Sequence, residues 1–151
     1  MSGAPMPPDP GAPTVLGLSH VALAVADADA TAAAFVTALG AERGRDTLLD
    51  GGRLRVVFLH LGPVTLELLE PRDPGHTVAK FLAARGPGLH HVSLEVADLD
   101  AALAHARAHG VRLVDETPRA GAHGTRIAFL HPKNLGGVLV ELSEGPGGAG
   151  S

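Results

Sequence analysis

The sequence predicts an α+β fold in which two βαβββ modules pair to form a cupped, mixed sheet. The main observation is an internal repeat: LSHVALAVAD, which begins at Leu18, nearly recurs as LHHVSLEVAD, which begins at Leu89. The same offset of 71 residues relates RVVFLH at 55–60 to RIAFLH at 126–131. Because this order is kept through a strand, a helix and two further strands, the repeat indicates duplication of one module.

Composition narrows the class of protein further. A chain of 151 residues with 45% hydrophobic content fits one compact unit, and the lack of Trp and Tyr predicts an aliphatic core. The net charge of −4 argues against nucleic acid and anionic membranes as partners. The chain has no cysteine, which excludes disulfides and thiolate metal sites. It has neither a leader pattern nor a stretch of roughly 20 apolar residues, so we expect a cytoplasmic protein.

The first module begins with a strand whose alternation puts His20 on the face opposite Val21. Asp27 stands where a helix N-cap belongs, and the Ala-rich segment after it ends near Gly40. The stretches RLRVVFLHLG and VTLELLEP then predict a hairpin. A further strand between residues 42 and 52 is the least defined element of the module.

The second module repeats this order. Its first strand is followed by Asp98 as the predicted N-cap of a helix that ends near Gly110, and TRIAFLHP and GGVLVELSE predict the second hairpin. Between the modules, HTVAKFLAARG places Val78, Phe81 and Leu82 at helical spacing and predicts a linker helix.

These elements predict the organisation of the chain. The first module spans about 16–71, the linker helix about 76–86 and the second module about 88–144, all within a single domain at 16–144. The Pro-rich residues 1–15 and the Gly-rich residues 145–151 bury too little apolar surface to order themselves and are expected to be flexible tails.

Each module offers one histidine and one glutamate to the same face of its sheet. Glu67 lies opposite its leucine neighbours in VTLELLEP, and Glu141 lies opposite its apolar neighbours in VLVELSE. The glutamates are 74 residues apart, and the longer HPKNLGG loop can absorb the three extra positions. If the modules pair about a pseudo-twofold axis, His20, Glu67, His91 and Glu141 converge in one cavity.

Two imidazoles and two carboxylates suit a divalent ion such as Co²⁺, Mn²⁺, Ni²⁺, Fe²⁺ or Zn²⁺ and leave positions for a substrate. Taken singly, each of the four residues is more simply explained as a structural histidine or a solvated glutamate. Their joint recurrence at matched positions favours a metal cavity, because four inward polar groups are costly to bury without an ion.

Other polar residues carry weaker signals. His60 and His131 match across the modules but end strands before turns, which favours a structural role. His90 should face the helix layer or the seam between modules, and Glu95 shares the face of the second-module histidine. His123, in the loop GAHG, should lie at the cavity mouth, where either a substrate contact or a simple turn would explain it.

The sequence resembles the methylmalonyl-CoA epimerases of the vicinal oxygen chelate superfamily, which includes glyoxalase I. Its most specific stretches are ELLEP, KFLAARGPGLHHVSLEV and PRAGAHGTRIAFLHPKNLGGVLVEL. The resemblance covers roughly 16–144 and implies a vicinal oxygen chelate domain, a divalent metal with Co²⁺ as first choice, an acyl-CoA substrate and a homodimer. The implied reaction interconverts (2R)- and (2S)-methylmalonyl-CoA by metal-assisted 1,1-proton transfer through an enediolate.

The resemblance also implies roles for single residues. The metal ligands fall on His20, His91 and Glu141, and Glu67 occupies the fourth position, which is Gln in some members. We expect Glu141 to be the proton-transferring carboxylate and Glu67 the symmetric second one. Some epimerases carry another glutamate on the strand through RLRVVFL, and the matching residue here is Val56.

Three other functions compete with this one. A glyoxalase I-type lactoylglutathione lyase uses almost the same four ligands, so the ligands alone do not separate it. An Fe²⁺ ring-cleaving dioxygenase would normally bind its metal through two histidines and one carboxylate, so Glu67 would be one ligand too many. A metal-free protein that binds a small ligand would be expected to have substituted ligand positions and more aromatic residues. Five basic residues are available for the phosphates of CoA: Lys80, Arg85, Arg119, Arg126 and Lys133.

Overall fold

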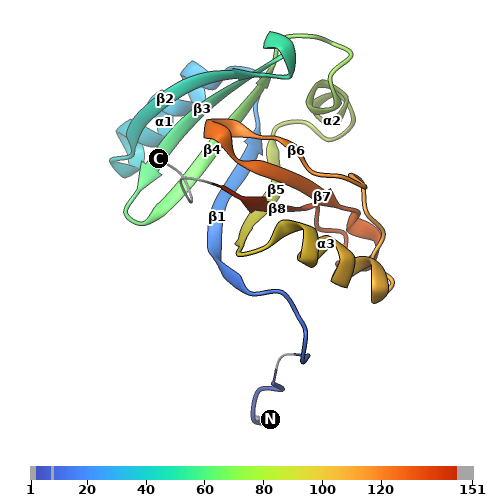
Figure 1. Ribbon diagram of the computed structural model, residues 1–151. Helices are drawn as coiled ribbons and strands as arrows, with labels where there is room; N and C mark the ends of the chain where they lie inside the picture. The colour runs from blue at the N-terminus through green and yellow to red at the C-terminus, as the bar shows by residue number, and fades with distance from the viewer. Residues whose placement is uncertain (1–2, 8, 146–151) are drawn as a thin grey trace.

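The computed structural model describes residues 3–7 and 9–145, in which eight strands form a curled sheet with helices packed against it (Figure 1). Residues 146–151 of the predicted C-terminal tail lie outside this description, and the first strand begins one residue before the predicted domain boundary. No helix of the described residues is long and apolar enough to cross a bilayer. The elements are β1 (Val15–Ala24), α1 (Ala28–Leu39), β2 (Glu42–Leu49), η1 (Asp50–Gly52), β3 (Leu54–Leu61), β4 (Val64–Pro71), α2 (Thr77–Arg85), β5 (Gly88–Val96), α3 (Leu99–Ala108), β6 (Arg119–Ala120), η2 (Ala122–Gly124), β7 (Arg126–Leu130), η3 (Pro132–Asn134) and β8 (Val140–Glu144).

The order of the strands reproduces the duplication. The sheet runs β2-β3-β4-β1-β5-β8-β7-β6, so the two modules meet at β1 and β5, which pair antiparallel. In each module the first strand pairs parallel with the last, β1 with β4 and β5 with β8. The predicted α+β fold of two paired βαβββ modules is therefore confirmed. The least defined strand, between residues 42 and 52, is present as β2, whereas its counterpart β6 has only two residues.

Helices α1 and α3 cover the outer face of the sheet, one on each module. Their small alanine side chains let them lie close to the strands, and the buried leucines and valines of β3, β4, β7 and β8 fill the layer between. Helix α2 packs instead near the inner face, where Val78, Phe81 and Leu82 contact the core that contains Val56 and Phe58. The apolar stripe predicted for the linker helix therefore faces the core, with Val78 buried and Phe81 and Leu82 partly buried. Polar residues described below occupy much of the rest of the inner face.

Equivalent hydrogen bonds hold the start of the outer helix in both modules. The backbone N–H of Ala28, at the start of α1, donates to Glu70 at 2.7 Å, and that of Leu99, at the start of α3, donates to Glu144 at 2.7 Å. A carboxylate at a helix N-terminus is favoured by both the free N–H group and the helix dipole. Arg126 donates to Glu144 at 3.0 Å and to Asp100 of α3 at 3.2 Å, which places it beside the outer helix.

Asp27 and Asp98 are the N-caps of α1 and α3, as predicted. The Asp98 carboxylate accepts from the N–H of Ala101 at 3.0 Å. We expect Asp98→Ala to lower the free energy of unfolding by about 1 kcal/mol, because one N–H at the helix start loses its partner. Urea unfolding followed by circular dichroism measures this change. Asp98→Asn keeps an oxygen acceptor and should lose much less, and an equal loss in both variants would contradict the capping role.

Candidate metal centre

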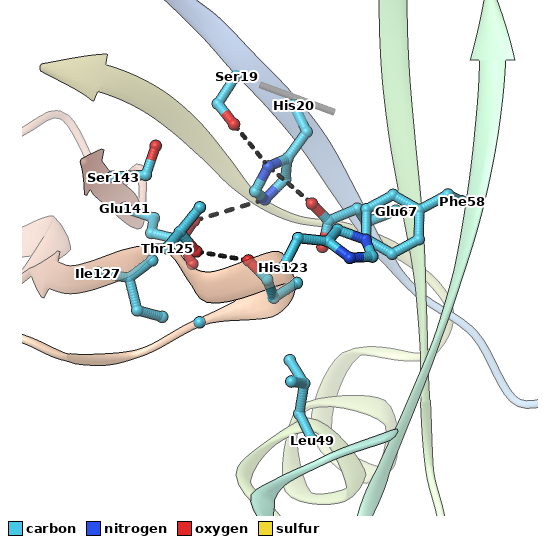
Figure 2. Close-up of a pocket in the computed structure, with 12 residues that line it drawn as sticks. Ser19, His20, Leu49, Phe58, Glu67, His123, Thr125, Ile127, Glu141 and Ser143 are labelled. Atoms are coloured by element: carbon cyan, nitrogen blue, oxygen red, sulfur yellow. Dashed lines mark hydrogen bonds and ion pairs between the residues drawn. The ribbon is translucent and has the colours of Figure 1, made fainter. Parts of the chain in front are cut away.

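The polar residues predicted to converge do lie on one face of the sheet, in two rows that cross the seam between the modules. In the first row His20 of β1 is opposite Ser93 of β5, which is opposite Glu141 of β8. Because paired residues on adjacent strands point to the same face, the three side chains lie together. Figure 2 shows His20 and Glu141 pointing into one pocket from neighbouring parts of the sheet.

The second row is the symmetric counterpart of the first. Glu67 of β4 is opposite Ala22 of β1, which is opposite His91 of β5. Each row therefore carries a glutamate, a small residue and a histidine, in opposite order across the seam. The small residues Ala22 and Ser93 are both fully buried and leave room above them for the larger side chains.

Three of the four predicted ligands come together closely. The Nε2 atoms of His20 and His91 are 3.3 Å apart, and oxygens of Glu141 lie 3.5 Å from His20 Nε2 and 3.6 Å from His91 Nε2. One ligand atom from each of the three residues lies within 4.8 Å of the others, and all three side chains are buried. These residues form a candidate metal site.

Glu67 is buried in the same cavity but contacts a different atom. Its Oε2 lies 2.7 Å from Nδ1 of His20, on the side of the ring away from Glu141. The two modules differ at the small residue of each row. Ser93 donates its hydroxyl to Glu141 at 2.7 Å, whereas its counterpart Ala22 has no hydroxyl to hold Glu67. The two glutamates thus differ both in their hydrogen-bond partner and in the histidine atom that they contact.

Burial and neighbouring charges shift the pKa values of these groups in different directions. Burial alone would lower the pKa of His20, but the hydrogen bond and charge of Glu67, together with the charge of Glu141, raise it above its usual value. Burial lowers the pKa of His91 well below its usual value, and the nearby positive charges of His20 and Arg119 add to the effect. Burial also raises the pKa of Glu141. At neutral pH His91 therefore offers a free lone pair on a ring nitrogen.

This donor set fits a divalent transition metal. Two imidazole nitrogens and a carboxylate converge away from water, and nitrogen lone pairs 3.3 Å apart repel one another unless a proton or a cation lies between them. Imidazole and carboxylate ligands together are typical of Fe²⁺, Co²⁺, Ni²⁺, Mn²⁺ and Zn²⁺ sites. The three residues could therefore hold such an ion. Glu67 lies close enough to Nδ1 of His20 to orient that ring as a ligand.

The cavity above these residues has two lobes that meet at Glu67 and Glu141. The first lobe has a volume of about 470 Å³ and is lined by His20, Phe58 and His123, among others (Figure 2). The second lobe has a volume of about 540 Å³ and contains His76, His90, His91 and Arg119. Glu95, which shares a face with His91, lines neither lobe.

The second lobe contains a pair that the sequence did not single out. His76, which is buried, contacts Asp50 through Nε2 at 2.7 Å and accepts from the N–H of Val78 through Nδ1. Residues 50 and 76 come from the β2–β3 turn and the start of α2, so no local pattern joins them. Arg119 also lines this lobe, where it lies over the ring of Phe129 at 5.5 Å and pairs with Asp115 at 3.3 Å and with Asp50 at 3.9 Å.

The remaining predicted residues have the following places. His90 packs its ring against Phe81 of α2 at 4.9 Å and contacts Nδ1 of His91 at 2.8 Å, so it lines the second lobe rather than facing the outer helices, and burial lowers its pKa to about 4. His131 accepts from the N–H of Lys133 and caps η3, and His60 lies beside Thr65 across the hairpin. Both roles are structural, in agreement with the prediction.

Comparisons with known proteins agree with this geometry. Residues 19–129 match the Glyoxalase/Bleomycin resistance protein/Dioxygenase superfamily. The chain is 39% identical over 128 residues to the mitochondrial methylmalonyl-CoA epimerase of Bos taurus, with 84% of this chain and 73% of that protein covered. It is 41% identical to the methylmalonyl-CoA epimerase of Mycobacterium tuberculosis, whose crystal structure superposes with a TM-score of 0.82 over 87% of this chain and 89% of that one. A methylmalonyl-CoA epimerase in complex with methylmalonyl-CoA and NH4⁺ is 34% identical, with a TM-score of 0.83 over 91% of this chain and 100% of that chain.

Proposed function

Because this chain belongs to the Glyoxalase/Bleomycin resistance protein/Dioxygenase superfamily and, within it, to the methylmalonyl-CoA epimerases, we propose that it interconverts (2R)- and (2S)-methylmalonyl-CoA. The observation that carries the proposal is the buried cluster of His20, His91 and Glu141 at the floor of the cavity. A related epimerase binds methylmalonyl-CoA, which supports an acyl-CoA thioester as the substrate.

We propose that His20, His91 and Glu141 hold a divalent ion, with Co²⁺ as first choice and Glu67 as a fourth ligand or as the partner of His20. When bound, the ion would draw negative charge toward the substrate's thioester and carboxylate oxygens and so make the hydrogen on C2 more acidic. Its position at the seam means that each module supplies part of the binding site.

Glu141 is our proposal for the proton-transferring carboxylate. Burial raises its pKa, which makes the carboxylate a stronger base than a solvated one, and the hydroxyl of Ser93 fixes one oxygen at 2.7 Å. The other oxygen lies 3.6 Å from Nε2 of His91, and we propose that it accepts the proton that leaves C2. Glu67 as the symmetric second proton-transferring group stays a prediction.

The walls of the cavity suit the rest of the substrate. In the first lobe Leu49, Phe58 and Ile127 provide apolar surface for the methyl branch of the acyl group and exclude water from the reacting carbon. In the second lobe Arg119 offers a positive charge for an anionic group, and Arg85 lies along the adjoining groove beside His91. We propose these two arginines as contacts for CoA phosphates or the substrate carboxylate.

Three further predictions accompany the proposed function. We propose that residues 16–144 form a single domain, because the site takes residues from both modules. A homodimer stays a prediction from the resemblance: Leu16 and Leu18 are exposed at one end of β1, whereas the exposed Leu89 lies at the other end of the β1–β5 pairing. A cytoplasmic location stays a prediction from the sequence.

The test of function follows solvent deuterium into each epimer of methylmalonyl-CoA by NMR, with chelator-stripped protein and with protein reloaded with Co²⁺. Metal-dependent exchange at C2 together with interconversion of the epimers is the expected result. A lack of exchange in every metal-loaded sample would overturn the epimerase assignment. The glutathione hemithioacetal of methylglyoxal would then test the glyoxalase I-type alternative, since that lyase uses almost the same ligands.

The raised pKa of His20 predicts how metal affinity depends on pH. Because the folded protein holds the His20 proton more tightly than a free imidazole does, an incoming ion must displace that proton below the raised pKa. We expect the Co²⁺ dissociation constant to rise roughly tenfold for each pH unit below that point and to be flatter above it. Competition titrations with a chromophoric chelator between pH 5 and pH 9 measure this. In Glu67→Gln the rise should begin at lower pH, because the carboxylate that raises the pKa is gone, and an unchanged profile would contradict this cause.

A further inference from the structure

His123 is held in an unusual backbone conformation at the wall of the first lobe. Its φ of 56° and ψ of 38° place it in the left-handed region, which few residues other than Gly adopt without cost. The loop is closed around it by hydrogen bonds from the N–H of Gly121 to Thr125 O at 2.9 Å and from the Thr125 hydroxyl to Ala122 O at 2.7 Å. Such strain persists where the surrounding structure enforces it, often at sites of function.

The His123 side chain is half-buried, and one of its ring nitrogens is buried and unsatisfied. It packs against the ring of Phe58 with the centroids 4.8 Å apart, so a loop of the second module contacts β3 of the first. Its Nε2 is buried and has no hydrogen-bond partner among the described residues. Leaving a polar atom buried and unpaired costs about 1–3 kcal/mol, so a partner from outside the chain is expected at this atom.

His123 shares its lobe with the base already proposed. Both Glu141 and His123 line the first lobe, but Glu141 comes from β8 in the floor whereas His123 comes from η2 and lies beside Phe58. Figure 2 shows the His123 ring on the side of Glu67 and Phe58, away from the strand that carries Glu141. A flat substrate intermediate between these two walls would present one face to each residue.

Resting on the function proposed above, we propose that His123 is a second catalytic residue, which exchanges a proton with C2 of the substrate on the face opposite Glu141. Inversion at C2 needs proton transfer at both faces of the planar intermediate. In one direction, Glu141 takes the C2 proton and the electrons of the C–H bond enter the thioester enolate. Nε2–H of the protonated His123 ring then gives its proton to the other face of C2, and the enolate electrons form the new C–H bond.

The protons gained and lost by the two residues balance over one catalytic cycle. After one turnover Glu141 holds one proton more and His123 one proton less, and exchange with water restores both. In the opposite direction neutral His123 takes the proton through Nε2 and protonated Glu141 returns one. Because both proton carriers exchange with solvent, each turnover in D₂O leaves deuterium at C2.

Three observations favour His123 for this role over Glu67, the second carboxylate predicted from the sequence, and over Val56. The carboxylate of Glu67 is already engaged, with Oε2 2.7 Å from Nδ1 of His20. Val56, on the strand that leads to Phe58, is fully buried in an apolar cluster and offers no proton carrier. Nε2 of His123 is the only side-chain polar atom of the described residues that is buried without a hydrogen-bond partner.

The test is His123→Asn, because Asn tolerates a left-handed backbone but cannot carry the proton. With Co²⁺-loaded protein and each pure epimer in D₂O, we expect interconversion to fall at least about 100-fold. One epimer, the one that Glu141 deprotonates, should still exchange its C2 hydrogen for deuterium without inversion. Glu141→Gln should show the opposite preference between the epimers. His109→Asn, at an exposed histidine that ends α3, is the matched control and should behave as wild type.

The outcomes separate this inference from the proposed function. If wild type interconverts the epimers and His123→Asn does so within about threefold, Glu141 or Glu67 serves the second face and the role of His123 is overturned. Equal loss of exchange from both epimers, with Co²⁺ affinity and unfolding midpoint unchanged, also overturns it, because a missing second base leaves one exchange intact. His123→Gly, which relieves the backbone strain as well, gives the same comparison if the Asn variant is unstable. A wild type that turns over neither epimer would overturn the proposed function itself.

Discussion

Replacement of Glu141 by glutamine is expected to reduce kcat by about 10²–10⁴-fold, the range over which a positioned acid or base contributes to a rate. Glutamine keeps the size of the side chain and can still pair with the Ser93 hydroxyl, but it cannot accept a proton from carbon. The fold should stay intact, because the variant removes a carboxyl group that is buried and whose pKa burial has raised. Steady-state rates with methylmalonyl-CoA measure the loss, and urea unfolding measures the stability.

The same substitution could weaken metal binding, so the two effects must be separated. Rates are compared at saturating Co²⁺, with the metal content of each sample measured by atomic absorption. Glu95→Gln is the matched control, since Glu95 lies on the same strand face as His91 but lines neither lobe of the cavity. A metal-replete Glu141→Gln protein with wild-type turnover would remove Glu141 from the role of base.

Removal of the metal is expected to reduce kcat/KM by about 10³-fold or more, and addition of Co²⁺ should restore it. An ion contributes several kcal/mol of charge stabilisation, and each 1.36 kcal/mol corresponds to a tenfold change in rate. His20, His91 and Glu141 remain in place without the ion, but they cannot by themselves neutralise the charge that forms on the substrate oxygens. Dialysis against a chelator followed by rate measurements tests this, and full activity of the stripped protein would contradict it.

Metal binding should also be visible without substrate. An ion that binds the folded chain alone stabilises it by about 2.7 kcal/mol at a concentration one hundred times its dissociation constant. Reloading with Co²⁺ should therefore raise the unfolding midpoint of the stripped wild type. His91→Ala loses one of the three clustered ligands and should show a much smaller rise, which ties the effect to this site rather than to binding at the surface.

The parts of the fold that the sequence predicts well are those governed by local periodicity. Alternation in β1 and β4 put His20 and Glu67 on the inner face, and the N-caps Asp27 and Asp98 marked the starts of both outer helices. The offset of 71 residues then related the modules without any structure. These features depend on neighbours within a few residues, which is why a sequence displays them.

The details of the site depend on contacts between distant elements and were not predictable in the same way. The repeat shows that Ala22 corresponds to Ser93, but it does not show that the Ser93 hydroxyl bonds Glu141 or that Glu67 contacts the other nitrogen of His20. The pair of Asp50 and His76 joins a turn to a helix start 26 residues later. The loop of His123 was expected at the cavity mouth, but its buried Nε2 follows from packing against Phe58.

The difference between Ala22 and Ser93 also bears on how a duplicated protein can change. Two identical halves related by a twofold axis would carry matching groups, and any substitution in an ancestral single module would alter both halves at once. After duplication, a substitution in one copy can change the hydrogen bonding of the glutamate in that copy, while the other copy stays the same. In the present chain residues 22 and 93 differ, so the two halves contribute unequally to a site whose backbone remains symmetric.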